Sequence, residues 1–216
     1  MRTLISLMGL GLATTLWADR VNFDAAEPGG VPAGWTVAVT GGGTPRWTVV
    51  RDASAPSKPN VLEQSGQAKF ALCLKDQPEF RDGSVRVRFK PVAGKEDQAG
   101  GVVWRYRDSE NYYVCRANAL ENNVVLYKVE NGKRSPLDIV GRKDGYGVKV
   151  AVAAGRWHTL GVSFAGTRFQ VWFDGRKQFQ VEDATFGEAG KVGLWTKADS
   201  LTRFDDFIWT ARRAVR

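Results

Sequence analysis

The side chains best suited to chemistry are polar and aromatic groups that lie between positions 104 and 128 and recur near position 195. Successive side chains of a strand point to opposite faces, so residues two apart share a face. Turning the apolar residues inward leaves one set on an open surface: Arg105, Tyr112, Arg116, Asn118 and Lys128. Trp195 and Lys197 could join this set from a later strand. We expect one patch, because consecutive strands are often neighbours.

Such a patch has the chemistry of a sugar site. An aromatic ring, here that of Tyr112 or Trp195, stacks on the apolar face of a pyranose, while guanidinium and amide groups hydrogen-bond hydroxyls or carboxylates. The alternative is a solvated sheet face whose cations form ion pairs. The acids available for such pairs are Asp108, Glu110, Glu121 and Glu130. The sequence leaves both interpretations open.

Groups that could hydrolyse a glycoside are sparse. Such chemistry needs two carboxyl groups about 5 to 10 Å apart across one cleft, and no acid near the polar patch has a convincing partner. The single histidine, His158, excludes multi-histidine zinc sites. It lies at the start of a predicted strand, where we expect a structural role rather than a place in a nucleophilic triad.

The elements that position these groups are β-strands. In Gly155–Lys177, Leu160, Val162 and Phe164 alternate with smaller or polar residues, as do Phe169, Val171 and Phe173. Ala165-Gly166-Thr167 and Asp174-Gly175 are typical of tight hairpin turns. Similar short apolar runs separated by turn residues follow one another along the chain, and no window shows a helical period. The pattern predicts an all-β, two-sheet antiparallel β-sandwich in a single domain.

The ends of the chain differ from this pattern. A positive start, an apolar run from Leu4 to Leu12 and the small residue Ala18 predict a signal peptide over residues 1–18. The domain would then span residues 19–210, followed by a basic tail over 211–216. We therefore expect an exported protein, periplasmic or extracellular, with no membrane span in the mature chain, and a monomer.

The distribution of charge narrows the classes of ligand that the protein could bind. The net charge is +8, but the basic residues are dispersed, which favours acidic glycans or an envelope surface over nucleic acid as the partner.

The two cysteines, Cys73 and Cys115, both lie in apolar strand patterns. A disulfide and two buried free thiols are therefore both possible.

Five segments in order resemble the concanavalin A-like jelly-roll superfamily, in particular laminin-G-like domains and bacterial secreted 3-keto-disaccharide hydrolase-type domains. They are FDAAEPGGVPAGW, FRDGSVRVRFKP, GGVVWRYRDSENYYVCRANALENNVVLYKVENGKR, GRWHTLGVSFAGTRFQVWFDGRK and GKVGLWTKADSLTRFDDFIW. The resemblance implies two antiparallel sheets, with a carbohydrate site on the concave face. The paired acids E-x-D-x-x-E of laminarinase-type glycosidases have no counterpart in this chain.

The resemblance also implies that the first and last strands lie side by side, where a calcium ion is often held. Asp24 and Asp206 would supply carboxylates to a structural calcium, with backbone carbonyls completing the site. The alternative is that these acids cap turns and keep an edge strand soluble.

We therefore expect a carbohydrate-binding jelly roll that recognises a glycan or sugar derivative on its concave sheet. Two alternatives remain: a 3-keto-glycoside hydrolase or lyase, which the resemblance implies, and a non-catalytic envelope protein that docks a partner. No catalytic residue is assigned.

Overall fold

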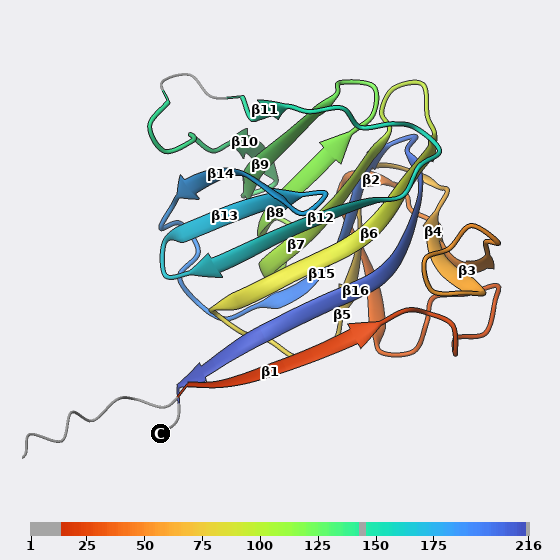
Figure 1. Cartoon of the computed structure of the whole chain (residues 1–216), viewed down its shortest axis with the longest axis horizontal. Coiled ribbons are helices and arrows are strands. Elements are labelled where there is room, and N and C mark those ends of the chain that lie inside the picture. Colours follow the sequence, from red (N-terminus) through yellow and green to blue (C-terminus); the bar gives the residue numbers. More distant parts are fainter. Residues whose placement is uncertain (1–13, 143–145, 215–216) are drawn as a thin grey trace, which may run out of the picture.

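The computed structural model of the chain describes residues 14–142 and 146–214, and within them there is no helix. Accordingly, no described helix is long and apolar enough to cross a membrane. The described residues form two antiparallel eight-stranded sheets stacked face to face (Figure 1). The all-β sandwich predicted from the alternation is confirmed.

We call one layer the back sheet. Its strand order is β14-β13-β12-β6-β16-β4-β3, and β1 pairs with β16. The strands are β1 (Thr14–Val21), β3 (Trp47–Arg51), β4 (Asn60–Gln64), β6 (Gly83–Ala93), β12 (His158–Ala165), β13 (Arg168–Phe173), β14 (Arg176–Glu182) and β16 (Leu201–Ala214).

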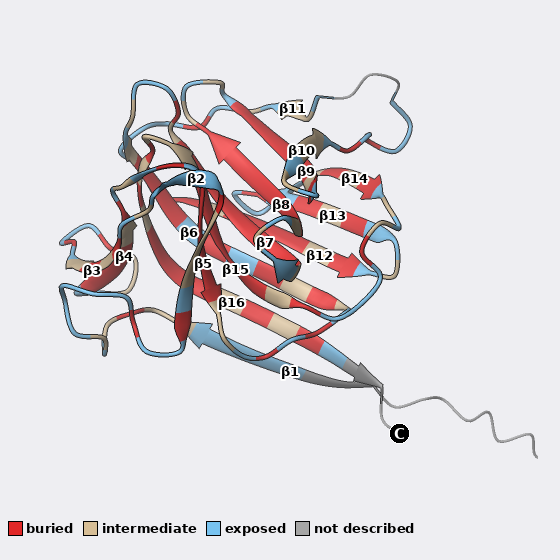
Figure 2. Ribbon diagram, turned by 180° about the vertical axis from the view of Figure 1, so that it is seen from behind, coloured by how far each residue is buried: buried red, intermediate tan, exposed pale blue. Residues whose placement is uncertain are grey.

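The other layer is the front sheet, ordered β10-β9-β8-β7-β15-β5-β2, with β11 paired to β9. Its strands are β2 (Trp35–Thr44), β5 (Gln67–Lys75), β7 (Ala99–Asp108), β8 (Asn111–Asn118), β9 (Asn123–Glu130), β10 (Lys133–Pro136), β11 (Val148–Lys149) and β15 (Lys191–Ala198). Most residues of β7, β8 and β9 are buried (Figure 2), because this sheet packs on both faces.

The hairpin of β12 and β13 shows how the alternation builds the interior. Leu160 pairs with Phe173 and Phe164 pairs with Phe169, and all four side chains are buried. The turn contains Gly166 with a φ of 55°, a left-handed conformation that costs glycine little. Because Leu160, Val162 and Phe164 share one face with Phe169, Val171 and Phe173, that face packs against the front sheet.

The main core lies between the sheets and is rich in aromatic rings. Trp104 of β7 stacks on Phe164 of β12 at 5.8 Å between ring centroids, and on Tyr113 at 5.4 Å. Both cysteines are buried in this core and free. Cys73 is on β5 and Cys115 on β8, with β15 and β7 between them, so the two-thiol alternative is the one found.

The ends of the chain meet at β1 and β16. Thr14–Val21 pairs with Phe207–Ala214 along its whole length. Most of the predicted signal peptide, residues 1–13, lies outside the described residues, and its last five residues belong to β1. In the predicted basic tail, positions 211–214 continue β16.

Candidate functional site

The outward face of the front sheet is a hollow with an apolar floor. Buried residues from five strands pack there as a cluster separate from the main core: Phe70, Leu72, Leu74, Ala99, Val103, Tyr112, Val114, Val125, Tyr127, Val129 and Trp195. The sheet curls so strongly that Arg134, from the edge strand β10, reaches Phe70 on β5. This face is therefore concave.

Arg134 covers the aromatic part of this floor. Its guanidinium carbon lies 4.3 Å from the ring centroid of Tyr127, 4.9 Å from that of Phe70 and 5.6 Å from that of Trp195. Such cation–π contacts stabilise a guanidinium that has lost part of its hydration. The Nη1 atom is buried and has no hydrogen-bond partner, so this group retains an unused donor beside the hollow.

The mouth of the hollow is basic. A cavity of about 510 Å³ is lined by Lys69, Phe70, Asn131, Gly132, Lys133, Arg134 and Lys197. A second cavity of about 420 Å³ shares Lys69 and Lys197 and adds Glu96. The residues that line the two cavities thus include four cations and one carboxylate, and Asp97 pairs with one of these cations, Lys197. The remaining excess of positive charge favours anionic ligands.

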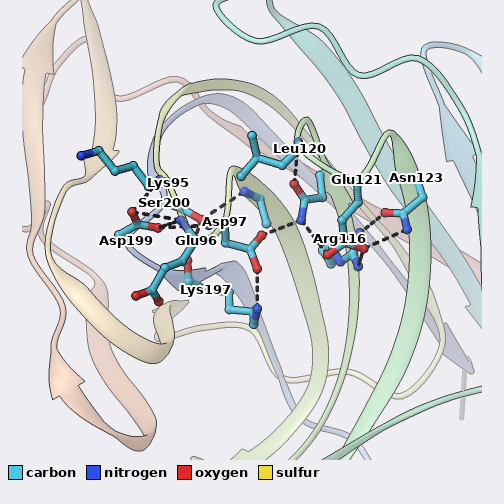
Figure 3. Close-up of polar contacts among 12 residues, drawn as sticks. Lys95, Glu96, Asp97, Arg116, Leu120, Glu121, Asn123, Lys197, Asp199 and Ser200 are labelled. Atoms are coloured by element: carbon cyan, nitrogen blue, oxygen red, sulfur yellow. Dashed lines mark hydrogen bonds and ion pairs between the residues drawn. The ribbon is translucent and has the colours of Figure 1, made fainter.

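A chain of polar side chains crosses the concave face beside the mouth (Figure 3). Lys197 Nζ donates to Asp97 Oδ2 at 2.6 Å, and Asn118 Nδ2 donates to Asp97 Oδ1 at 2.6 Å. Asn118 also donates to Glu121 Oε1 at 3.0 Å, and Arg116 Nη2 donates to Glu121 Oε2 at 2.8 Å. Each carboxylate thus joins Asn118 to one cation.

The loop that carries Asp97 is held by a single carboxylate. Asp199 accepts from the backbone N–H of Lys95 at 2.6 Å and from those of Glu96 and Asp97 at 3.0 Å. Although desolvation acts in the opposite direction, these backbone donors lower the pKa of Asp199. The hydrogen bonds from the loop backbone to Asp199 therefore fix the position of Asp97.

The other end of the chain contains two tyrosines. Arg116 Nη2 donates to the hydroxyl of Tyr127 at 2.9 Å and to that of Tyr146 at 3.2 Å, and the two hydroxyls are 2.6 Å apart. Burial raises the pKa of Tyr127. Partial burial acts to raise the pKa of Glu121, but Arg116, Asn123 and Lys197 together outweigh it and lower that pKa. The cluster therefore provides fixed hydrogen-bonding groups rather than a strong base.

Three of the predicted site residues meet in this network: Arg116, Asn118 and Lys197. Arg116 and Asn118 are almost fully buried, so they support the floor more than they face solvent. Lys197 lies at the mouth. Tyr112 shares their face but is completely buried and bonds Thr40 Oγ1 at 2.8 Å, so its expected exposure is wrong.

The expected placement of Arg105 is wrong because β7 contains a bulge. Its register with β8 shifts between Trp104 and Asp108, and Arg105 has a φ of 47°. The extra residue turns the side chain away from the concave face. The guanidinium is 1 % exposed and donates at 2.7 Å to the backbone carbonyls of both Gly166 and Phe186.

The expected placement of Lys128 is also wrong, because β9 has the opposite phase. Val129 and Tyr127 face the hollow, so Lys128 between them points to the other side of the sheet. Its Nζ donates to Thr185 Oγ1 at 2.8 Å and lies 3.3 Å from a carboxylate oxygen of Glu130.

Trp195 lies on the concave face as expected but is not an open stacking platform. Its side chain is fully buried, packed against Phe70 at 5.3 Å between ring centroids and beneath Arg134. Phe70 lines the cavity at the mouth, but its side chain is only 4% exposed and also lies beneath Arg134.

The two acids assigned to calcium have other partners. Asp206 Oδ1 accepts from Arg20 Nη2 at 2.5 Å, and Oδ2 lies 3.5 Å from Arg88 Nε. Asp24 accepts from the Asn22 side chain and from the Asn60 backbone. Within residues 14–142 and 146–214, no three His, Cys, Asp or Glu side chains are arranged to hold a metal. Arg20 would repel a calcium ion at Asp206, so Asp24 and Asp206 do not fit calcium in this arrangement. Calcium binding itself is untested and stays a prediction.

Other residues of the site were not predicted: Asp97, Tyr146, Lys69 and Arg134. Asp97 and Tyr146 lie in loops, where alternation gives no signal. Arg134 follows the turn Asn131-Gly132, which predicts a hairpin, but only the curl of the sheet brings its side chain over β5 and β15.

The fold and the concave hollow together define a jelly roll of the class that contains glucanases and carbohydrate-binding modules. The model of the 3-keto-alpha-glucoside-1,2-lyase-like domain matches residues 21–208, and the chain belongs to this family. No curated protein matches the sequence.

Solved structures agree on the fold. Carbohydrate binding module CBM66 from Bacillus subtilis has a TM-score of 0.63 and 21% identity, over 81% of this chain and 93% of that chain. The Bacillus licheniformis beta-glucanase has a TM-score of 0.58 and 14% identity, over 91% and 98%. A lichenase derived from a mouse hindgut metagenome has a TM-score of 0.55 and 13% identity, over 90% and 98%.

Proposed function

We propose that this chain is an exported, non-catalytic binding protein for acidic saccharides, and that the ligand enters the mouth of the concave hollow. The observation that carries the proposal is the composition of the mouth, where Lys69, Lys133, Arg134 and Lys197 line one cavity together with Phe70. The name of the carbohydrate binding module, whose fold is similar, supports a sugar as the ligand.

The chemistry of the mouth favours a sugar that carries a carboxylate or sulfate. Lys69 and Lys133 are exposed and form no ion pair among the described residues. Arg134 lines the same cavity, and a guanidinium can bind a carboxylate through two parallel hydrogen bonds. A neutral glycan would leave this charge uncompensated, so we expect preference for acidic over neutral sugars.

Calorimetric titration with trigalacturonate and a heparin-derived sulfated disaccharide, with neutral galactotriose as reference, tests the proposal. We expect binding of an acidic probe, weakened by salt. Arg134→Gln should reduce affinity about ten-fold or more, while Arg134→Lys, which keeps the charge, should lose less. Arg51→Ala is the matched control, because Arg51 is an exposed cation at the far edge of the back sheet.

Two results would contradict the proposal. One is equal affinity for galactotriose and the acidic probes. The other is unchanged binding of an acidic probe in both Arg134→Gln and Lys197→Ala, with both variants shown to be folded by their thermal unfolding.

Family membership favours a second candidate function, cleavage of 3-keto-glycosides. Removal of a proton beside a ketone requires a base. The acids and phenols on the concave face are poorly tuned for this role, because the pKa of Glu121 is lowered and that of Tyr127 is raised. Incubation with a 3-keto-disaccharide decides the matter: turnover that is lost in Glu121→Gln would favour the enzyme.

A further inference from the structure

The outward face of the back sheet carries a slot that the concave site does not use. Trp172 of β13 pairs with Gly161 of β12, and Gly161 pairs with Arg86 of β6. These three strands lie side by side in Figure 1. Since paired residues on neighbouring strands are about 5 Å apart, the two side chains flank a gap of roughly 10 Å whose floor has no side chain.

The gap is a measurable cavity of about 360 Å³. Its floor is formed by Gly161 and the adjoining backbone, Trp172 and Arg86 form its walls, and hydroxyls of Ser84, Thr159 and Ser163 complete its lining. The glycine is needed there, because an added Cβ would lie 2.9 Å from the Cβ of Arg86. Any side chain at position 161 would also fill the slot.

The groups around the slot are unoccupied by protein partners. The ring of Trp172 is 39% exposed. Within the described part of the chain, Trp172 makes no ring contact, Arg86 forms no ion pair, and the side-chain hydroxyl of Thr159 makes no hydrogen bond. By contrast, the nearby Arg168 pairs with Glu182 at 3.0 Å.

The charge around the slot is positive. A smaller cavity of about 190 Å³ shares Arg86 and Thr159 with the slot and adds Arg20, Arg88 and Asp206. Asp206 is contacted by both Arg20 and Arg88. Three arginines therefore face one carboxylate, and Arg86 is the one without an acidic partner.

From this geometry we propose that the slot is a second saccharide site, which binds one pyranose unit of an acidic glycan. The apolar face of the ring stacks on Trp172, the carboxylate or sulfate pairs with Arg86, and the three hydroxyls contact the ring substituents. The site is separate from the concave mouth, because the two lie on opposite outer faces of the sandwich.

A purely structural role for Trp172 makes a different prediction. An aromatic ring can cover a glycine on the neighbouring strand and stabilise the pair. Truncation would then lower the unfolding temperature without affecting any ligand. Binding at Trp172, and its loss when Arg86 is changed, separates the two roles.

The test follows the indole N–H signals of the full chain by NMR during titration with trigalacturonate, with a sulfated heparin disaccharide as the second arm. Trp172→Phe assigns the Trp172 signal. We expect this signal to shift with at least one acidic probe and not with galactotriose. Arg86→Gln should reduce the affinity measured from this shift about ten-fold or more. Arg168→Gln, on the same face, should leave the affinity unchanged.

Two outcomes overturn the second site: no movement of the Trp172 signal at millimolar concentrations of either acidic probe, or equal movement in wild type and Arg86→Gln. A failure of the concave site can be distinguished from a failure of the slot. Arg134→Gln should leave the Trp172 titration intact, so a molecule with only the slot active would still shift this signal.

Discussion

Two guanidinium groups on the concave face differ in how fully their donors are used. Arg116 is 2% exposed and contacts Glu121, Asn123, Tyr127 and Tyr146. Arg134 rests on three aromatic rings and keeps Nη1 unpaired. A buried donor without a partner costs stability, and of these two guanidinium groups only that of Arg134 lines the mouth. Arg116 is structural, and Arg134 is the residue that we expect a ligand to contact.

Replacement of Arg116 should therefore affect stability. Arg116→Met keeps the apolar volume but leaves Glu121, Asn123 and Tyr127 without their donor. Because Glu121 is partly solvated, we expect a loss of about 1 to 3 kcal/mol in the free energy of unfolding. Urea denaturation measures this loss. Arg134→Met is the matched variant, and we expect a smaller loss from it. An equal or larger loss in Arg134→Met would contradict the distinction.

Tyr112 gives a prediction at alkaline pH. Burial raises its pKa to about 12, although the bond with Thr40 partly opposes this, whereas an unfolded tyrosine titrates near pH 10. The folded state therefore holds the proton more tightly. Its contribution, about 2 to 3 kcal/mol, is fully present below pH ~10 and is lost as pH rises toward 12.

Urea unfolding of wild type and Tyr112→Phe at a series of pH values checks this contribution. The wild-type stability should fall more steeply above pH ~10 than that of the variant, which has no phenol to titrate at this position. Parallel curves for the two proteins would contradict the raised pKa of Tyr112.

At the scale of the elements, close packing between the sheets decides several sequence choices. Gly100 of β7 faces Phe89 of β6, and an added Cβ would lie 2.5 Å from Phe89 Cδ2. The register of β7 with β8 is regular at Gly100 and Gly101, and the bulge falls at Arg105. The glycine is explained by the approach of the opposite sheet.

Gly100→Ala should accordingly destabilise the sandwich by about 1 to 3 kcal/mol, because the methyl group overpacks the contact with Phe89. A second substitution, Phe89→Leu, makes room. In the double variant the cost of the alanine should shrink, which a double-mutant cycle of unfolding free energies measures. Additive losses would show that the two side chains do not meet.

The strands also show which parts of the molecule the sequence predicts. Period-two alternation and turn residues gave the hairpin of β12 and β13 and the sandwich, because burial of one face is a local pattern. The alternation also placed Arg116, Asn118 and Lys197 together for the same reason. It failed at Arg105, where one bulged residue reverses the faces, and at Arg134, which meets its aromatic partners only through the curl of the whole sheet.

At the scale of the molecule, two layers share one interior and present two outer faces. The concave mouth and the slot at Trp172 both carry excess positive charge, in agreement with the net charge of +8. Because the main core separates them, substitutions in one site should not change ligand binding at the other.

Cleavage of the predicted signal peptide would shorten β1. It would remove positions 14–18, including Trp17, whose ring packs edge-on against that of Trp209 at 5.0 Å between centroids. The mass of the exported chain checks whether this cleavage occurs.

The two free thiols have a practical consequence. Cys73 and Cys115 are completely enclosed between the layers, and burial raises the pKa of both, so the reactive thiolate is scarce and shielded. Maleimide dyes should therefore ignore the native molecule. A cysteine introduced at an exposed position would be the sole attachment point for a fluorophore or spin label, with no need to delete the natural pair.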